Sequence, residues 1–313
     1  MNTAIRVRGL AKSYGGLRAV DGVSFDVAEG EVLAILGPNG AGKTTPVEIL
    51  EGHRNRDSGE VSVLGTDPDS GGRRFRDRIG IVLQAAGVDR ELSTREALEL
   101  YGAAYSSPRS IDELIELVEL QDSADDRIVS LSGGQQRRVD LALGLIGNPE
   151  LIFLDEPTTG FDQRARRRSW DVISNLTSLG RTIVLTTHYL DEAEYLADRI
   201  AVMSKGRIVA DGTLAELRES LQSDTKIAFE LPRLEEPLME LLDPLVGQGR
   251  GRGRRVEVLT PAPTVDLAHI TSWAVQRGIE LDGLTVESAD LEDVYLSLVG
   301  EDEDSEDSGR ADE

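Results

Sequence analysis

The sequence predicts an α/β protein with a parallel-sheet core, followed by a smaller α+β domain. Short apolar runs end in polar residues at "LIFLDEP" (151–157) and "TIVLTTH" (182–188). This pattern is typical of buried parallel strands that carry functional side chains at their carboxyl ends. These runs alternate with helical stretches, which favours a parallel sheet. The pattern changes near residue 220, so we expect domains at 1–220 and 221–300 and a tail at 301–313.

Local periodicity predicts the elements in order. "IRVRGLAKSY" and "VSFDVAEGEVLAILG" are β-branched runs broken by glycine and indicate strands. Apolar residues recur every three or four positions, as in amphipathic helices, in residues 43–52, in residues 94–105 and in the stretch "SIDELIELVEL" from Ser110. Between Thr225 and Gly300 we expect about three strands and three helices, interrupted by a loop, "GQGRGRGRR". The last 13 residues are mostly acidic and are expected to be disordered.

The composition limits the classes of function. Cysteine is absent, which excludes disulfides and thiolate metal sites and suits a cytosolic protein. No apolar run approaches the roughly 18–20 residues of a membrane span, and "MNTAIRVRG" is not a secretion signal, so any membrane role is expected to need a partner. A net charge of −23 disfavours nucleic acid as a partner. Only four of the 34 basic residues are lysine, which is consistent with a prokaryote with a salt-rich cytoplasm or with an arginine-biased genome.

A phosphate-binding loop follows the strand "EVLAILG". Its sequence, "GPNGAGKT", matches G-x-x-x-x-G-K-[ST], in which backbone N–H groups and a helix N-terminus surround an anion. Lys43 is expected to reach the β- and γ-phosphates, and the Thr44 hydroxyl to bind Mg²⁺. A chance glycine-rich turn is the alternative, but the strand before the loop and the amphipathic stretch after it argue against one. The expected cradle comprises Gly37, Pro38, Asn39, Gly40, Ala41, Gly42, Lys43, Thr44 and Thr45.

A proline follows this loop closely and raises the question of whether the site is intact. Pro46 lacks a backbone donor and restricts Thr45 before it. However, the first N–H groups of a helix have no intrahelical partner, so the missing donor costs little there. We therefore expect a local distortion and a working phosphate site.

A second motif, "LSGGQQRR" at 131–138, narrows the choice among nucleotide-binding proteins. Together with the phosphate loop, "LIFLDEP", Gln84 and His188, it resembles the ATP-binding-cassette (ABC) ATPases over residues 4–220. The resemblance implies a P-loop NTPase fold of the ABC type: a parallel-sheet core, an antiparallel β subdomain and a helical subdomain that carries the signature motif. It also implies ATP and Mg²⁺ as ligands.

Five further positions then acquire expected roles. Asp155 would hold Mg²⁺ through water, and Glu156 would polarise the attacking water as general base. His188 would contact the γ-phosphate, Gln84 would meet Mg²⁺ or water and report to a membrane partner, and Tyr14 would stack on adenine. Each role has an alternative. The two acids, Asp155 and Glu156, could merely face solvent, and His188 could be a polar strand end. Gln84 could be an ordinary loop residue, and Tyr14 a core tyrosine.

The resemblance also implies a shared site between two chains. In this family the signature completes the site of the other subunit, so two ATP molecules are held between two cassettes arranged head to tail. One chain that carries every motif favours a homodimer. The run "RARRR" at 164–168, which follows the motif "TTGFDQ", is expected to be a solvated helix face. The residues expected at this interface are Ser132, Gly133, Gly134, Gln135 and Asp162, of which the aspartate would otherwise be an ordinary turn residue.

Longer phrases, such as "LSGGQQRRVDLALGLIGNPELIFLDEPTTGFD", resemble the daunorubicin-resistance type of drug-export ATPase subunit. "LEDVYLSLVG" at 291–300 resembles the C-terminal motif of those subunits. The resemblance implies an ATP-hydrolysing exporter subunit on the cytoplasmic face of the membrane, bound to a separate permease of the ABC-2 type that moves drugs or other small molecules. A soluble, non-transport ABC ATPase with a regulatory role is the alternative, as is a binding protein without turnover.

Overall fold

The structure is a computed structural model that divides into two units, Met1–Thr213 and Leu214–Glu313. It describes residues 2–82, 87–178, 180–220, 225–231, 241–242, 244–252 and 254–287. Gln84 and the segments 291–300 and 301–313 lie outside these residues.

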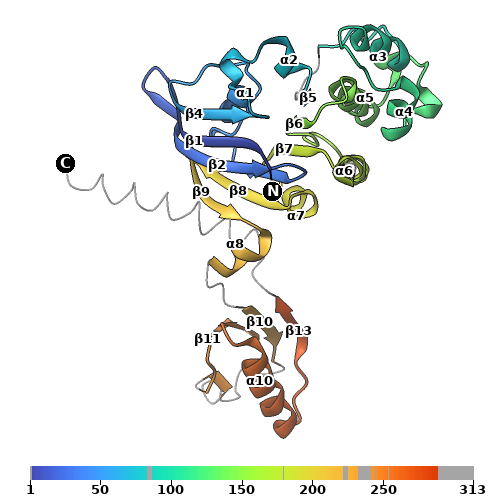
Figure 1. The fold of residues 1–313 in the computed structure, drawn as a ribbon. Helices are drawn as coiled ribbons and strands as arrows, with labels where there is room; N and C mark the ends of the chain where they lie inside the picture. The colour runs from blue at the N-terminus through green and yellow to red at the C-terminus, as the bar shows by residue number, and fades with distance from the viewer. Residues whose placement is uncertain are drawn as a thin grey trace. The chain divides into compact units, whose positions relative to one another are not determined.

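A six-stranded sheet forms the centre of the first unit (Figure 1). Its order is β5-β6-β7-β3-β8-β9, and all neighbours are parallel except β8 and β9. β3 and β7 are buried along their whole length, which explains the apolar runs "VLAIL" and "IVL"; the other three residues of β7 are buried threonines. The strands are β3 (Val32–Leu36), β5 (Ile79–Val82), β6 (Leu151–Asp155), β7 (Thr182–Thr187), β8 (Arg199–Ser204) and β9 (Arg207–Gly212).

A three-stranded antiparallel sheet packs against this core. Its order is β2-β1-β4, with β1 at Thr3–Tyr14, β2 at Leu17–Ala28 and β4 at Ser58–Val63. One cluster of buried side chains joins Phe25 of β2 to Phe153 of β6 and Val47 of helix α1 (Thr44–Leu50). The two sheets and the helix after the phosphate loop therefore share one apolar core.

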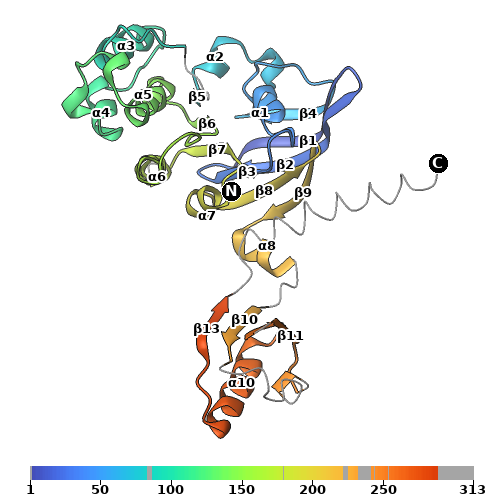
Figure 2. The same cartoon turned by 180° about the vertical axis from the view of Figure 1, so that it is seen from behind.

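Three helices gather at the end of the unit away from β1, β2 and β4, as both views show (Figures 1 and 2). They are α3 (Thr94–Gly102), α4 (Ile111–Leu117) and α5 (Gly133–Leu145). A capping box between Ser93 and Glu96 fixes the start of α3. The signature motif begins α5, so the predicted fold class is confirmed, including its antiparallel and helical subdomains. The other helices of this unit are α2 (Gly72–Arg76), α6 (Gln163–Ser178) and α7 (Leu190–Leu196), with short 3₁₀ turns at Pro68–Ser70, Gln121–Ser123 and Ile128–Ser130.

The second unit contains an antiparallel sheet in the order β11-β12-β10-β13. Ile227, Phe229 and Trp273 belong to its own apolar core, so this unit is α+β as predicted. Its elements are α8 (Leu214–Ser220), β10 (Thr225–Glu230), β11 (Gln248–Arg252), β12 (Arg255–Thr260), α10 (Pro263–Arg277) and β13 (Asp282–Glu287).

The prediction that "GQGRGRGRR" forms a loop is wrong. Its first part forms β11, which pairs with β12 from Gln248 opposite Leu259 to Arg252 opposite Arg255. The described residues of this unit thus hold four strands where three were expected. Glycine weakens a strand in isolation, but pairing with a neighbouring strand outweighs that preference.

Helix α1 answers the question raised by Pro46. The helix begins at Thr44 and runs through Pro46 to Leu50, so the proline is its third residue. At that position the backbone N–H would have no intrahelical acceptor, and the proline ring is buried instead. The proline is therefore accommodated within the first turn.

Replacing Pro46 with threonine tests this interpretation. Because the donor is not needed, Pro46→Thr should change the free energy of unfolding by no more than roughly 1–3 kcal/mol. The dissociation constant for ATP should change only modestly, as measured by titration calorimetry. A chain that binds ATP only after this substitution would show that the natural loop is broken.

A buried carboxyl group follows α1. Glu51 is 3% exposed, and the Nδ1 atom of His53 lies 3.3 Å from its Oε2. Burial, together with the negative charges of Asp155 and Glu48, raises its pKa to about 8. The folded protein therefore holds this proton more tightly than the unfolded chain does.

Glu51→Gln should accordingly change the pH dependence of stability. The folded-state pKa of about 8 exceeds the ordinary 4.5, so the wild-type protein loses stability as the pH rises between these values. Glutamine cannot ionise, so the variant should gain roughly 2–5 kcal/mol relative to wild type between pH 4.5 and pH 8.5. Urea unfolding across this range measures the difference. Glu60→Gln, at an exposed position, is the control, and an equal slope in both variants would contradict the assignment.

Candidate active site

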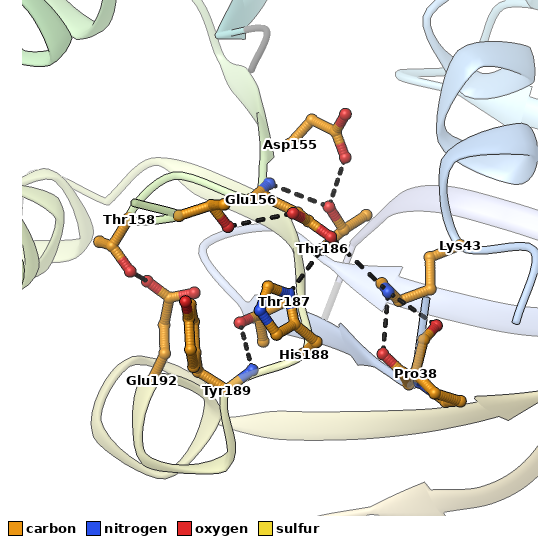
Figure 3. Close-up of polar contacts among 12 residues, drawn as sticks. Pro38, Lys43, Asp155, Glu156, Thr158, Thr186, Thr187, His188, Tyr189 and Glu192 are labelled. Atoms are coloured by element: carbon orange, nitrogen blue, oxygen red, sulfur yellow. Dashed lines mark hydrogen bonds and ion pairs between the residues drawn. The ribbon is translucent and has the colours of Figure 1, made fainter. Parts of the chain in front are cut away.

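The ends of three neighbouring strands create the site. In the order β6-β7-β3, Asp155 pairs with Thr186 and Leu36 pairs with Thr187. Because these strands are parallel, the residues that follow them meet at one edge of the sheet. Figure 3 shows the result: Lys43, Glu156 and His188 come together from three separate segments.

Lys43 lies at the base of the phosphate loop. It is 5% exposed and donates hydrogen bonds to the carbonyl oxygens of Gly37, at 2.8 Å, and Pro38, at 3.1 Å. Burial lowers its pKa, while the negative charges of Glu156 and Asp155 oppose that shift. A buried ammonium that is held mainly by carbonyl dipoles is well placed to donate hydrogen bonds to a phosphate oxygen.

The loop itself has a shape that suits a phosphate group. Gly42 has φ +97°, and a Cβ atom there would lie 2.3 Å from the Ala19 carbonyl oxygen, so the position requires glycine. Gly40 has φ +85°, and its hypothetical Cβ would meet nothing within 4 Å. Asn39 and Gly40 are exposed, which leaves the outer side of the loop accessible to a ligand.

Two oxygen donors fit a magnesium ion. Thr44 is exposed at the start of α1, and Asp155 ends β6. The Thr186 hydroxyl donates to Asp155 Oδ1 at 2.5 Å and so orients this carboxylate. Among the described residues, no group of three or more His, Asp or Glu forms a metal cage. Magnesium suits such a site because it commonly binds through one or two protein oxygens together with substrate phosphates and water.

Glu156 is the point where the segments meet. Its Oε1 lies 3.4 Å from His188 Nδ1 and 3.8 Å from Lys43 Nζ, and its Oε2 accepts a hydrogen bond from Thr159 Oγ1 at 3.0 Å. The side chain is 16% exposed. Its backbone adopts the left-handed region, with φ 45°, and its N–H donates to the carbonyl oxygen of Thr186 at 3.1 Å. This carboxylate is oriented and accessible, as a general base must be.

The signature residues form a second group. Ser132 is the N-cap of α5 and accepts the N–H of Gln135, whose side chain in turn accepts the N–H of Ser132. The positive end of the 13-residue helix therefore lies at Ser132. Asp162 caps α6 in a similar way, accepting the N–H of Ala165 at 2.8 Å. A hollow of about 590 Å³ is lined by both segments, including Ser132, Gly133, Gly134, Gln135 and Asp162.

The structure thus sorts the expected site residues into two groups. Lys43, Glu156 and His188 meet at the strand ends, whereas the signature residues and Asp162 share the separate hollow. Tyr14 ends β1 with 39% of its surface exposed, and the guanidinium of Arg54 lies 5.2 Å from its ring centre. Its stacking on adenine stays a prediction. Gln84 lies outside the described residues.

Sequence reasoning missed the residues that support this site. Thr186 and Thr159 orient the two carboxylates, and the Arg137 guanidinium donates to the carbonyl oxygens of Asp155 and Pro157. A buried carboxylate, Glu192, accepts hydrogen bonds from the hydroxyl of Thr158 and from the indole of Trp170. The only available signal was the proximity of these residues in sequence to strand ends and the signature motif.

Comparisons with known proteins agree with this geometry. A family described as "ABC transporter" matches residues 20–159, and a second family, described as "ABC transporter domain-containing protein-like, C-terminal domain", matches residues 225–290. The chain is 40% identical over 312 residues to the daunorubicin resistance ATP-binding protein DrrA3 of Streptomyces coeruleorubidus, covering 96% of this chain and 97% of the relative. It is 37% identical over 302 residues to the Nod factor export ATP-binding protein I of Rhizobium johnstonii, covering 95% of both chains.

Solved structures show the same fold. A dimeric ATP-binding cassette in a post-hydrolysis state, bound to ADP and phosphate, superposes with a TM-score of 0.61 at 28% identity and covers 67% of this chain and 98% of that one. The ATP-binding subunit of another ABC transporter gives a TM-score of 0.63 at 26% identity, covering 70% and 93%. The chain therefore belongs to the ABC transporter family, as one of its ATP-binding and ATP-hydrolysing subunits.

Proposed function

We propose that this chain drives an exporter through a separate membrane permease of the ABC-2 type. The convergence of Lys43, Glu156 and His188 carries the ATPase part of the proposal, because it unites a phosphate ligand, a base and a second phosphate contact. The relatives named for daunorubicin resistance and Nod factor export support the transport part. In the described part of the chain, no helix has the length and hydropathy that a membrane span requires.

Each residue at the strand ends has a distinct task. The loop from Gly37 to Thr45 holds the phosphates through its backbone N–H groups, and Lys43 exchanges its carbonyl partners for phosphate oxygens. Thr44 and Asp155 would hold Mg²⁺, which neutralises phosphate charge when it is bound. Glu156 takes the proton of the attacking water, and His188 orients the γ-phosphate.

The hollow beside Ser132 receives the nucleotide of a second copy. Its N-cap serine and helix N-terminus favour an anion, and Asp162 lies on the same surface. Two cassettes arranged head to tail would therefore complete two ATP sites, each with the base of one chain and the signature of the other. One chain with both groups favours two identical copies.

The site is expected to act from the cytoplasmic face of the membrane. Gln84 and the segment 85–105 would pass the closure of the cassettes to the permease. Substrates are then chosen by the permease, and the relatives favour a drug-like or other small molecule. The relatives give no support to the interpretation of the acidic composition as salt adaptation.

A non-transport ATPase with a regulatory role is the second candidate. The names of the relatives, which refer to drug resistance and to Nod factor export, favour transport over this candidate. Co-purification with the product of a neighbouring permease gene, followed by measurement of substrate-stimulated ATPase activity, separates the two candidates. A chain that hydrolyses ATP but binds no permease would favour the regulatory role.

The C-terminal domain is proposed to support assembly. It has its own apolar core, around Phe229 and Trp273, and the strand-end residues of the active site all belong to the first unit. Truncation after residue 220 should leave the ATP dissociation constant of the cassette unchanged while weakening dimer or permease assembly, measured by light scattering. Loss of ATP binding in a folded truncated chain would contradict this assignment.

Removing the base while keeping the site tests the mechanism. Glu156→Gln preserves size but cannot accept a proton, so hydrolysis should fall by a factor of about 10² or more, in line with the usual contribution of general base catalysis. ATP should still bind, and size-exclusion chromatography with Mg²⁺ and ATP should show an accumulated dimer.

Adding Ser132→Arg to that variant should return the chain to a monomer, because a long cation then occupies the N-cap of α5. Hydrolysis measured for the Glu156→Gln chain provides the baseline. Wild-type turnover in that chain, without a dimer, would refute both assignments.

A further inference from the structure

Arg137 joins the signature helix to the segment that carries the proposed base. It lies on α5, five residues after the N-cap Ser132. Its Nε atom donates to the carbonyl oxygen of Pro157 at 3.1 Å, and its Nη2 atom donates to that of Asp155 at 3.0 Å. A longer contact of 3.5 Å reaches the carbonyl oxygen of Glu156. The side chain is 11% exposed, so these contacts are shielded from water.

These carbonyl groups bracket a residue with an unfavourable backbone conformation. Glu156 has φ 45°, a left-handed conformation that side-chain-bearing residues adopt only when their surroundings impose it. On one side, the N–H of Glu156 donates to the carbonyl oxygen of Thr186 on β7. On the other side, the guanidinium of Arg137 holds the carbonyl groups before and after it. The direction of the Glu156 carboxylate depends on both restraints.

The chemistry of these contacts requires arginine. A guanidinium presents several donors in one rigid plane, so it fixes two carbonyl oxygens in a set geometry. A lysine ammonium can also donate to two carbonyl oxygens, but it is a single point on a flexible stem and imposes no such geometry. The buried charge is balanced by these carbonyl dipoles and by Asp140, whose Oδ2 lies 3.8 Å from Arg137 Nη1. Arg137, Asp140 and Glu156 also line one small hollow of about 200 Å³.

We infer that Arg137 is a positioning residue for the base Glu156, and that through it α5 links the two ATP sites of a dimer. This inference rests on the proposed function. The N-terminus of α5 carries Ser132 toward the nucleotide of the partner, and the next turn of the same helix fixes the base of its own chain. A shift of α5 when the signature contacts ATP therefore reaches Glu156 through one side chain.

Variants of Arg137 in the full-length chain test this role. Arg137→Gln and Arg137→Lys should each lower the single-turnover rate of ATP hydrolysis at least tenfold, because neither side chain reproduces the rigid, planar donor geometry with which the guanidinium holds the carbonyl oxygens of Asp155 and Pro157. The dissociation constant for ATP should stay within threefold of wild type, because the phosphate loop is unchanged. Arg127→Gln, which removes an exposed ion pair with Glu91 in the same subdomain, is the matched control and should keep the wild-type rate.

The decisive measurement combines Arg137→Gln with Glu156→Gln. If Arg137 acts through the base, adding Arg137→Gln to Glu156→Gln should leave the residual rate unchanged within twofold. An equal tenfold loss in both backgrounds, or an ATP affinity that falls as much as the rate, would overturn the inference. Wild-type rates in both Arg137 variants would overturn it too. If the Arg137→Gln chain does not fold, the Arg137→Lys chain, which keeps the buried charge, is used for the same measurement. The Glu156→Gln chain alone tests the proposed function. A failure of the proposed function can therefore be distinguished from a failure of the inference about Arg137.

Discussion

The arrangement around Glu156 depends on the order of three parallel strands. Because β7 lies between β6 and β3, the segments that follow all three open at the same edge of the sheet. Lys43 and His188 then approach one carboxylate oxygen, and Thr159 binds the other. The buried ammonium donates to the carbonyl oxygens of Gly37 and Pro38 and lies 3.8 Å from the Glu156 carboxylate, so both charged groups remain available to a phosphate group and water. The rest of the first unit positions these few side chains.

Much of this arrangement could be predicted because it follows local rules. The apolar runs "LIFL" and "IVL" indicate parallel strands that are buried on both faces, so the polar residues that follow them were expected at the edge of the sheet. The same holds for Lys43, which is fixed by a glycine-rich loop between a strand and a helix. Even Pro46 was interpretable, since only the first turn of a helix tolerates a missing donor.

The remaining features depend on contacts between segments distant in sequence. The strand β11 forms in a glycine-rich stretch because β12 supplies its hydrogen bonds, which no local propensity indicates. The left-handed conformation of Glu156 and the bridge from Arg137 arise only where α5 packs near β6. The raised pKa of Glu51 likewise depends on burial and on the charge of Asp155, more than 100 positions along the chain. Sequence motifs thus located the reacting groups but not the residues that orient them.

The central claim is that one ATP is held by the phosphate loop of one chain and the signature of another. Photocleavage with orthovanadate tests this directly, because vanadate replaces the transferred phosphate and breaks nearby backbone on irradiation. With Mg²⁺ and ATP present, peptide mapping should find cleavage both in the loop 37–45 and near Ser132, and the second cut should vanish in the Ser132→Arg chain. Cleavage confined to the phosphate loop, in a chain that hydrolyses ATP, would contradict a site shared between two subunits.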